Sequence, residues 1–121
     1  MSTRKKVADV GDFEVIAGEP WEQSFRLNNL TSPTTKVPED LTGWTGWFCN
    51  WRPYVTSTET ISLTVEVEPL DGLLTIIADE AETALMLVRG TVGVFGIAGI
   101  DPDGNERTRI RGTTSQSADP S

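Results

Sequence analysis

One stretch of the chain, residues 40–53, limits the possible folds more than any other. It reads Asp-Leu-Thr-Gly-Trp-Thr-Gly-Trp-Phe-Cys-Asn-Trp-Arg-Pro and holds three of the four tryptophans and the only cysteine. Aromatic residues and threonine, bounded by Asp and Gly before and by Pro after, are typical of a β-strand. Strict alternation places these side chains on two faces: Trp44, Gly46, Phe48 and Asn50 on one, and Thr45, Trp47, Cys49 and Trp51 on the other.

Because both faces of this strand carry aromatic residues, both need a cover. An antiparallel sheet in an isolated domain usually exposes one face to water. We expect the face with Trp47, Cys49 and Trp51 to point outward, where such strands ordinarily carry polar residues. Three covers fit the sequence: residues 1–11 or 28–39 of the chain itself, a second protein subunit, or a sugar stacked on the tryptophan pair.

The rest of the hydrophobic pattern predicts further short strands separated by turns. Period-two alternation or apolar runs occur at residues 12–16, 21–27, 61–68, 73–78, 91–100 and 105–112. Asp79, with Glu82 three positions later, predicts the capped start of a short helix over residues 79–88. Four small or apolar residues are expected on the inner face of that helix: Ala81, Ala84, Leu85 and Val88.

Glycines interrupt the apolar strand at 91–100 at positions 93, 96 and 99. Glycine weakens a strand unless a neighbouring group packs against the bare backbone. We therefore predict that this strand pairs with the tryptophan strand, so that the glycines give the indole rings a flat surface to lie on.

Strands and turns at this spacing favour a single all-β domain, an antiparallel β-sandwich with Ig-like or Greek-key-like connections and the one short helix. We assign the sandwich to residues 12–112, a docking arm to residues 1–11 and a flexible tail to residues 113–121. Residues 28–39 are expected to form a long loop. The last strand is expected at a sheet edge, with Arg107, Arg109 and Arg111 as one cationic row that discourages random pairing.

Charge is unevenly distributed along the chain. The total is −8, but residues 7–106 hold four basic and seventeen acidic residues, a net charge of −13. Such an acidic body repels nucleic acid, so no nucleic-acid partner is expected. The basic ends, with Arg4, Lys5 and Lys6 at the start, could instead contact acidic neighbouring copies, or these charges simply keep the chain soluble. There is no apolar run long enough for a membrane helix and no apolar signal segment, so we expect no membrane partner and synthesis in the cytoplasm.

The sequence offers little for catalysis. It has no histidine, which excludes histidine-based nucleophiles and histidine metal ligands. Cys49 lies in a tryptophan-rich strand and fits a small buried residue better than a nucleophile. Asp101, Asp103 and Asn105 alternate like the start of a calcium loop, but the later glycine and glutamate are missing, so a hairpin turn is the better interpretation. We expect no enzyme activity, no catalytic residue, no cofactor and no metal.

The order of several short motifs resembles a known group of proteins. They are Ile16-Ala-Gly-Glu followed by Phe25, then Asp40-Leu-Thr-Gly-Trp, then Gly72-Leu-Leu-Thr-Ile with Asp79-Glu-Ala-Glu-Thr, then Gly90, Asp103-Gly104 and Arg111-Gly112. Over residues 13–112 this series is similar to small β-sandwich proteins of tailed-phage (siphophage) virions, nearest to the long-tail-fibre collar and baseplate sandwich family.

The resemblance implies an accessory structural protein of a bacteriophage virion. Its partners would be other virion subunits, either major capsid or tail and baseplate proteins, and it would occur as a homo-oligomer or in multiple copies on a lattice. The residues we assign to such an interface are Arg4, Lys5, Lys6, Trp47, Trp51, Arg107, Arg109 and Arg111. The alternative is a carbohydrate- or receptor-binding module for adhesion to a host cell surface.

Overall fold

The computed structural model of the protein describes residues 7–32 and 35–118. This part of the chain contains nine strands, one α-helix and one short 3-10 helix. In chain order they are β1 (Ala8–Ile16), β2 (Trp21–Arg26), β3 (Asn28–Ser32), β4 (Thr35–Pro38), β5 (Thr45–Arg52), β6 (Ile61–Glu68), η1 (Pro69–Asp71), β7 (Leu73–Ala78), α1 (Glu80–Arg89), β8 (Val92–Ile100) and β9 (Glu106–Ser117).

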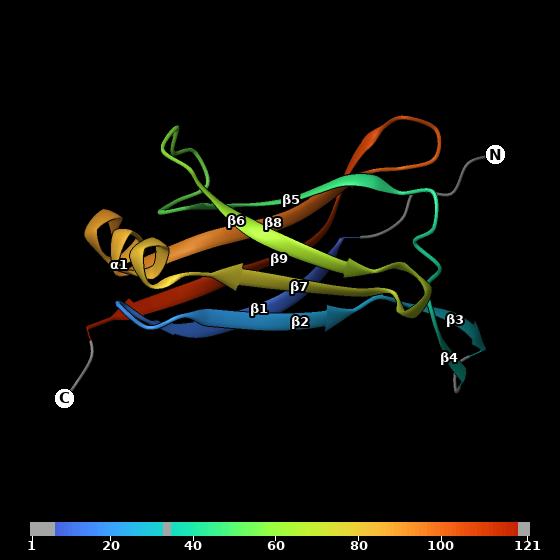
Figure 1. The fold of residues 1–121 in the computed structure, drawn as a ribbon, viewed down its shortest axis with the longest axis horizontal. Coiled ribbons are helices and arrows are strands. Elements are labelled where there is room, and N and C mark those ends of the chain that lie inside the picture. The colour runs from blue at the N-terminus through green and yellow to red at the C-terminus, as the bar shows by residue number, and fades with distance from the viewer. Residues whose placement is uncertain (1–6, 33–34, 119–121) are drawn as a thin grey trace.

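Seven of the strands form one sheet, in the order β1-β9-β8-β5-β6-β7-β2, which folds over into two layers (Figure 1). Strand β6 belongs to both layers, because residues 61–63 pair with β5 and residues 64–68 pair with β7. All neighbours in this sheet are antiparallel except β1 and β9, which run parallel. The prediction of an all-β sandwich with one short helix is confirmed.

Aromatic side chains close the side where the two ends of the sheet meet. Phe13 of β1 lies 6.3 Å from Trp21 and 5.5 Å from Phe25, measured between ring centroids. Phe95 of β8 lies 5.7 to 6.1 Å from all three rings. Because β1 and β2 are not neighbours in the hydrogen-bonded order, side chains rather than backbone bring the sheet close to a closed barrel.

The predicted pairing of the tryptophan strand with the glycine-rich strand is confirmed, as β5 pairs with β8. A Cβ atom added at Gly93 would lie 2.3 Å from the Trp51 indole, and one added at Gly99 would lie 2.7 Å from the Trp47 indole. These two glycines therefore leave the space that the rings occupy. Gly96 does not contact an indole ring. A Cβ atom added at Gly96 would have its nearest neighbours in β9, at 3.6 Å or more.

The tryptophan-bearing face of β5 points inward, so the prediction that it points outward was wrong. Cys49 and Trp51 are fully buried and Trp47 is partly buried against the core. The layer formed by β6, β7 and β2 covers this face, because it folds back over β5 and β8. The outward face of β5 carries Phe48, Asn50 and Arg52.

A β-bulge at Gly46 also corrects the predicted alternation. The register between β5 and β8 shifts between Thr45 and Phe48, and Gly46 has a φ of +62°, a conformation that glycine adopts readily. The extra residue brings Trp44 to the same side as Trp47. Their rings stack with centroids 5.3 Å apart and 17° between the planes.

Helix α1 begins as predicted, with a reciprocal capping box between Asp79 and Glu82. Its predicted inner face was wrong, because Val88 is 80% exposed while Thr83 and Met86 are fully buried. The Thr83 hydroxyl donates to the carbonyl of Glu19, 2.9 Å away, and so ties the helix to the turn between β1 and β2. The other three residues predicted for the inner face are also exposed: Ala81, Ala84 and Leu85.

The strands extend beyond the predicted domain boundaries. Strand β1 begins at Ala8, inside the expected arm, and β9 continues to Ser117, inside the expected tail. Thr114 and Gln116 of β9 are buried and hydrogen-bonded. Residues 113–117 therefore form a paired strand although their polar composition predicted a flexible tail. The expected loop at residues 28–39 contains the β3–β4 hairpin, which projects from the end of the sandwich opposite α1 (Figure 1).

Candidate functional site

The residues assigned to an interface from the sequence do not form one surface. Arg4, Lys5 and Lys6 lie outside the described residues. Trp51 lies in the core, where its Nε1 donates to the Thr114 hydroxyl at 2.8 Å. As Trp51 has no exposed surface in the monomer, it cannot contact a partner there, and Trp47 is only partly exposed.

The three arginines of β9 are separated by a second bulge, so they do not form one row. The register between β8 and β9 shifts after Ile97, which leaves Arg109 as an extra residue. Arg109 is 3% exposed, whereas Arg111 is exposed and lies opposite Gly96 on the outward face. Strand β9 is also not an edge strand, because it lies between β1 and β8. Both predictions about this strand were wrong.

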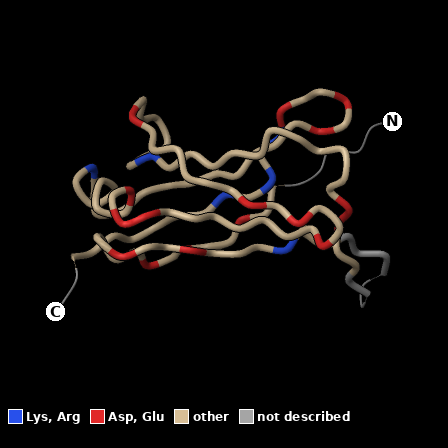
Figure 2. Tube along the Cα trace, viewed as in Figure 1, with Lys and Arg blue, Asp and Glu red and all other residues tan. Residues whose placement is uncertain are grey.

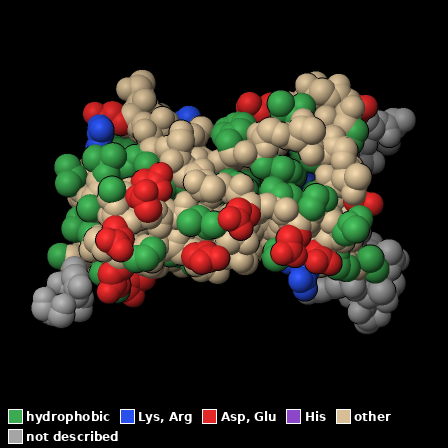
Figure 3. Space-filling view, viewed as in Figure 1, with side chains coloured by type: hydrophobic (Ala, Val, Ile, Leu, Met, Phe, Trp, Pro, Cys, Tyr) green, Lys and Arg blue, Asp and Glu red, His purple; other side chains and the backbone are tan. Residues whose placement is uncertain are grey.

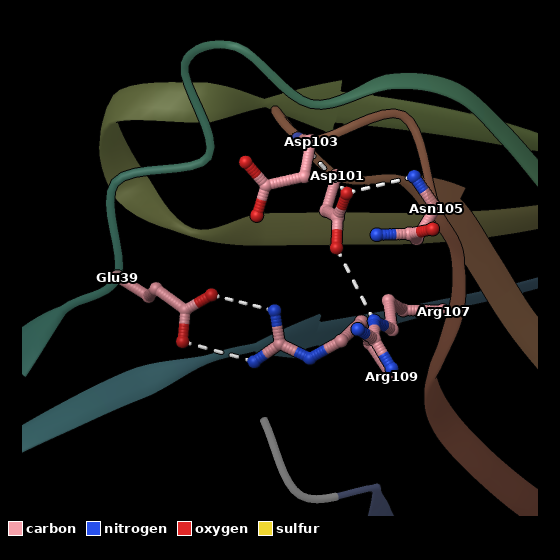
Figure 4. Close-up of polar contacts among 6 residues, drawn as sticks. All are labelled: Glu39, Asp101, Asp103, Asn105, Arg107 and Arg109. Carbon is pink, nitrogen blue, oxygen red and sulfur yellow. Dashed lines mark hydrogen bonds and ion pairs between the residues drawn. The ribbon is translucent and has the colours of Figure 1, made fainter. Parts of the chain in front are cut away.

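Arg109 forms a buried, bidentate ion pair with Glu39 (Figure 4). The two nitrogen–oxygen distances are 2.6 and 2.9 Å, and both side chains are almost fully buried. The guanidinium carbon also lies 5.0 Å from the centroid of the Trp44 ring, within the range of a cation–π contact. This cluster joins the segment after β4 to β9, which is a structural role within the chain.

Arg107 belongs to a different cluster, at the turn between β8 and β9 (Figure 4). The Asp101 carboxylate accepts hydrogen bonds from the backbone N–H groups of Asp103 and Asn105 and from Arg107 Nε, at 2.9 to 3.2 Å. The Asn105 backbone bond is the largest of the causes that lower the pKa of Asp101. The carboxylate oxygens are thus used to hold the turn, and among the described residues no acidic or cysteine cluster could hold a metal ion.

The surface that the sequence did not lead us to expect is the outward side of β8. Five outward side chains, called here the β8 outer row, are all apolar or glycine although β8 is a central strand: Val92, Val94, Gly96, Ala98 and Ile100. A groove of about 590 Å³ runs over the middle of this row, with Phe48 of β5 beside it. The sequence did show apolar residues on both faces of this strand, which could have indicated the surface.

Exposed apolar residues extend the groove at one end. Val55, in the connection after β5, is 71% exposed and lines both the groove and an adjoining hollow, together with Val94 and Thr113. Tyr54 and Val92 line the hollow and are largely exposed. A contiguous apolar surface of this kind on a small protein is typical of an interaction site. We call the groove and the hollow together the outer groove.

Two arginines flank the outer groove without an ion-pair partner among the described residues. Arg52 of β5 lies opposite Val94, and Arg111 of β9 lies opposite Gly96. Ion pairs within the described part of the chain engage Arg89, Arg107 and Arg109 instead. Within residues 7–32 and 35–118, no acceptor takes a hydrogen bond from the buried Arg52 Nε.

Negative charge dominates elsewhere on the molecule. Figure 2 shows many acidic and few basic residues along the strands that face the viewer, and Figure 3 shows acidic side chains spread over that face. The outward side chains of β6 include Glu66 and Glu68, and those of β2 include Glu22. The outer groove lies on the other layer; its middle is apolar, and it is lined by Arg52 and Arg111 as well as by acidic residues, Asp9, Asp12 and Glu106.

The cysteine that the sequence analysis weighed as a nucleophile does not line the outer groove. Cys49, the one thiol of the chain, points into the core, and burial raises its pKa to about 12. A thiol in that state is neither deprotonated nor accessible at neutral pH.

Among the described residues, no helix combines the length and apolar character that crossing a bilayer requires.

Comparison with known proteins gave structural similarities but no family. No family model and no curated protein matches the chain. Among solved structures, murine CRIg superimposes with a TM-score of 0.42 and 9% sequence identity, covering 89% of this chain and 92% of that chain.

Proposed function

We propose that this chain is a non-enzymatic accessory structural protein of a bacteriophage virion, which binds other protein subunits and decorates or stabilises their lattice at the capsid surface or at the tail and baseplate collar. The virion context rests on the motif resemblance over residues 13–112. The observation that carries a binding role is the outer groove, an apolar surface on a central strand that no described part of the chain covers.

A protein partner suits the outer groove for physical reasons. Burying apolar surface stabilises a complex by about 25 cal/mol per Å², and the β8 outer row presents such surface on a rigid sheet. Arginine is enriched at interfaces because its planar group forms directed hydrogen bonds while its stem packs against apolar neighbours. Arg52 and Arg111 stand at both sides of the row and are available for this purpose.

Location is the direct test of the virion role. Antibodies against the chain should label purified particles of the phage that encodes it, and mass spectrometry should find it in those particles at a fixed stoichiometry. Labelled positions on the capsid or at the tail would decide between the two proposed sites. If the chain were abundant in infected cells but absent from purified particles, the virion role would be refuted.

A variant can test whether the outer groove is the binding surface. A side chain added at Gly96 meets no atom closer than 3.6 Å, so Gly96→Lys should fold and place a long charged side chain in the groove. Thr64→Lys, on the exposed outward side of β6, is the matched control. We expect the Gly96 variant to be depleted from particles at least about tenfold relative to the control, as expected when an interface centre is blocked.

The carbohydrate-binding alternative gains no support from the tryptophans. The Trp44 ring is engaged by Trp47 and by Arg109, and the Trp47 ring lies over Gly99. A sugar needs a free indole face on which to stack. Binding to a glycan array that is lost on mutation of Trp44 would favour this alternative and count against the proposal.

A further inference from the structure

We infer that the outer groove is the contact surface of a symmetric homodimer, in which two copies of the chain pack face to face about a two-fold axis parallel to their strands. This inference rests on the proposed role of the groove as a protein-binding surface and names its occupant as a second copy. Two features of the surface support the inference: its area and the pattern of charges across it.

Four strands contribute to this surface: β5, β8, β9 and β1. At about 4.8 Å per strand, and with nine residues of β8 at about 3.3 Å each, the face measures roughly 19 by 30 Å. Each copy then contributes about 570 Å², and a face-to-face pair buries about 1,100 Å². This exceeds the value of about 1,000 Å² that a specific interface requires.

One row of paired residues across this face has a positive charge at its β5 end and a negative charge at its β1 end. Arg52 of β5 lies opposite Val94 of β8, which lies opposite Thr113 of β9, which lies opposite Asp12 of β1. One row across the sheet thus begins with an arginine, passes over apolar and hydroxyl groups, and ends with an aspartate. The Asp12 carboxylate accepts hydrogen bonds from the Thr113 and Ser115 hydroxyls, at 2.9 and 3.0 Å, which holds it in place.

This polarity selects one of the two symmetric ways to stack the face on itself. Rotation about a two-fold axis parallel to the strands leaves the position of each residue along the strand direction unchanged. It exchanges the β5 side of the face with the β1 side. It can therefore place Arg52 of each copy against Asp12 of the other. An axis perpendicular to the strands would leave the sides unexchanged and place Arg52 near Arg52 and Asp12 near Asp12, which like-charge repulsion disfavours.

The spacing of packed sheets is compatible with these contacts. Sheets that pack face to face lie about 10 Å apart and are rotated by about 30°. An arginine and an aspartate side chain that extend from opposite sheets can span that distance. Within one copy, Arg52 and Asp12 are three strand spacings apart, about 14 Å, so they have little influence on each other there.

The overall charge of the chain also favours this face over the others. Two bodies with a net charge of −8 repel each other, and the layer of β6, β7 and β2 carries exposed glutamates. The outer groove is lined by two arginines, Arg52 and Arg111, and by three acidic residues, Asp9, Asp12 and Glu106. A second copy is therefore repelled less at this surface, where arginines accompany the acidic residues and the middle is apolar.

Sedimentation velocity on the purified full chain, at low salt and over a range of concentrations, tests the inference. The wild-type chain should dimerise. Arg52→Asp and Asp12→Arg should each weaken the dimer at least about tenfold, because each replaces two attractive contacts by two repulsive ones. The combined Arg52→Asp/Asp12→Arg chain exchanges the charges and should recover most of the wild-type affinity.

Gly96→Lys serves as a steric block, with Thr64→Lys as the matched control on the other layer. The blocked chain should sediment as a monomer and the control as the wild type, while circular dichroism and urea unfolding check that each variant is folded. A wild-type chain that stays monomeric, or a charge exchange that fails to restore dimers lost in the single variants, would overturn the inference.

The two proposals fail in different experiments. A monomeric chain that is still found in purified particles would leave the virion role standing without the dimer. A dimer with the predicted charge dependence, in a chain that particles lack, would leave the dimer standing without the virion role. An acidic protein that binds the monomer through Arg52 and Arg111, with no dependence on Asp12, would replace the second copy as the occupant.

Discussion

Replacing Gly93 with alanine should destabilise the protein strongly, whereas the same change at Gly96, three residues along the same strand, should not. A Cβ at Gly93 would lie 2.3 Å from three atoms of the Trp51 indole, closer than real Cβ contacts. Trp51 is fully buried and cannot turn toward solvent. Overpacking of this kind costs about 1–3 kcal/mol, and displacement of the ring also breaks its hydrogen bond to Thr114, worth about 1 kcal/mol.

The expected loss of unfolding free energy is therefore roughly 2–4 kcal/mol, or a melting temperature about 10 °C lower for a chain of this size. At Gly96 the nearest atoms would lie at 3.6 and 3.7 Å, ordinary contact distances. Alanine there should change the unfolding free energy by less than about 0.5 kcal/mol, or stabilise the fold by restricting the unfolded chain. Urea unfolding followed by tryptophan fluorescence, at low protein concentration, measures both.

A double-mutant cycle identifies the cause. In a Trp51→Leu background the indole is absent, so Gly93→Ala should cost much less than it does in the wild-type chain. Equal losses in the two backgrounds would show that the strand requires glycine at position 93 for another reason. Equal effects of alanine at Gly93 and Gly96 would refute the packing argument altogether.

Three further predictions follow from the same structure. Arg109→Met should cost about 3–5 kcal/mol in urea unfolding because it removes both charged hydrogen bonds that the buried Glu39 carboxylate accepts from the guanidinium, and adding Glu39→Leu should recover part of the loss. Since burial raises the pKa of Cys49 from 9.0 to about 12, the unfolded thiol ionises first, and the unfolding free energy should fall above pH 9 by up to about 1.4 kcal/mol per pH unit, a slope that Cys49→Ala lacks. Asp79→Ala should cost about 1 kcal/mol through loss of the helix cap, while Glu80→Ala on the same exposed turn should cost less, as thermal melting would show.

Local patterns predicted the elements that depend on neighbouring residues. The alternation from Ile61 to Val67 fixed a strand and its inward face, because one side of the sheet is buried and the side-chain period is two. The capping box at Asp79 located the start of α1, since the hydrogen bonds involved span only three residues. The strand at 91–100 and its role beside the tryptophans were also evident from the glycine spacing.

Bulges and long-range contacts were not predictable in this way. The alternation failed at Gly46 and again at Arg109, because one inserted residue reverses the faces beyond it and leaves no clear mark on composition. The inner face of α1 was misjudged because docking through Thr83 depends on the turn between β1 and β2, about sixty residues earlier.

The amino-acid sequence by itself determined that the chain is a β protein, where most of its strands lie, and that Trp51 and its neighbours must be covered. Only the tertiary structure decided that the chain covers them with its own second layer, and that Arg109 is buried against a glutamate 70 residues away. The same folding left the other side of β8 open, so that the outward valines, rather than the tryptophans, became the exposed apolar surface. The physical reason is that residue type and spacing set which side chains alternate, whereas burial depends on which distant strand folds over which face.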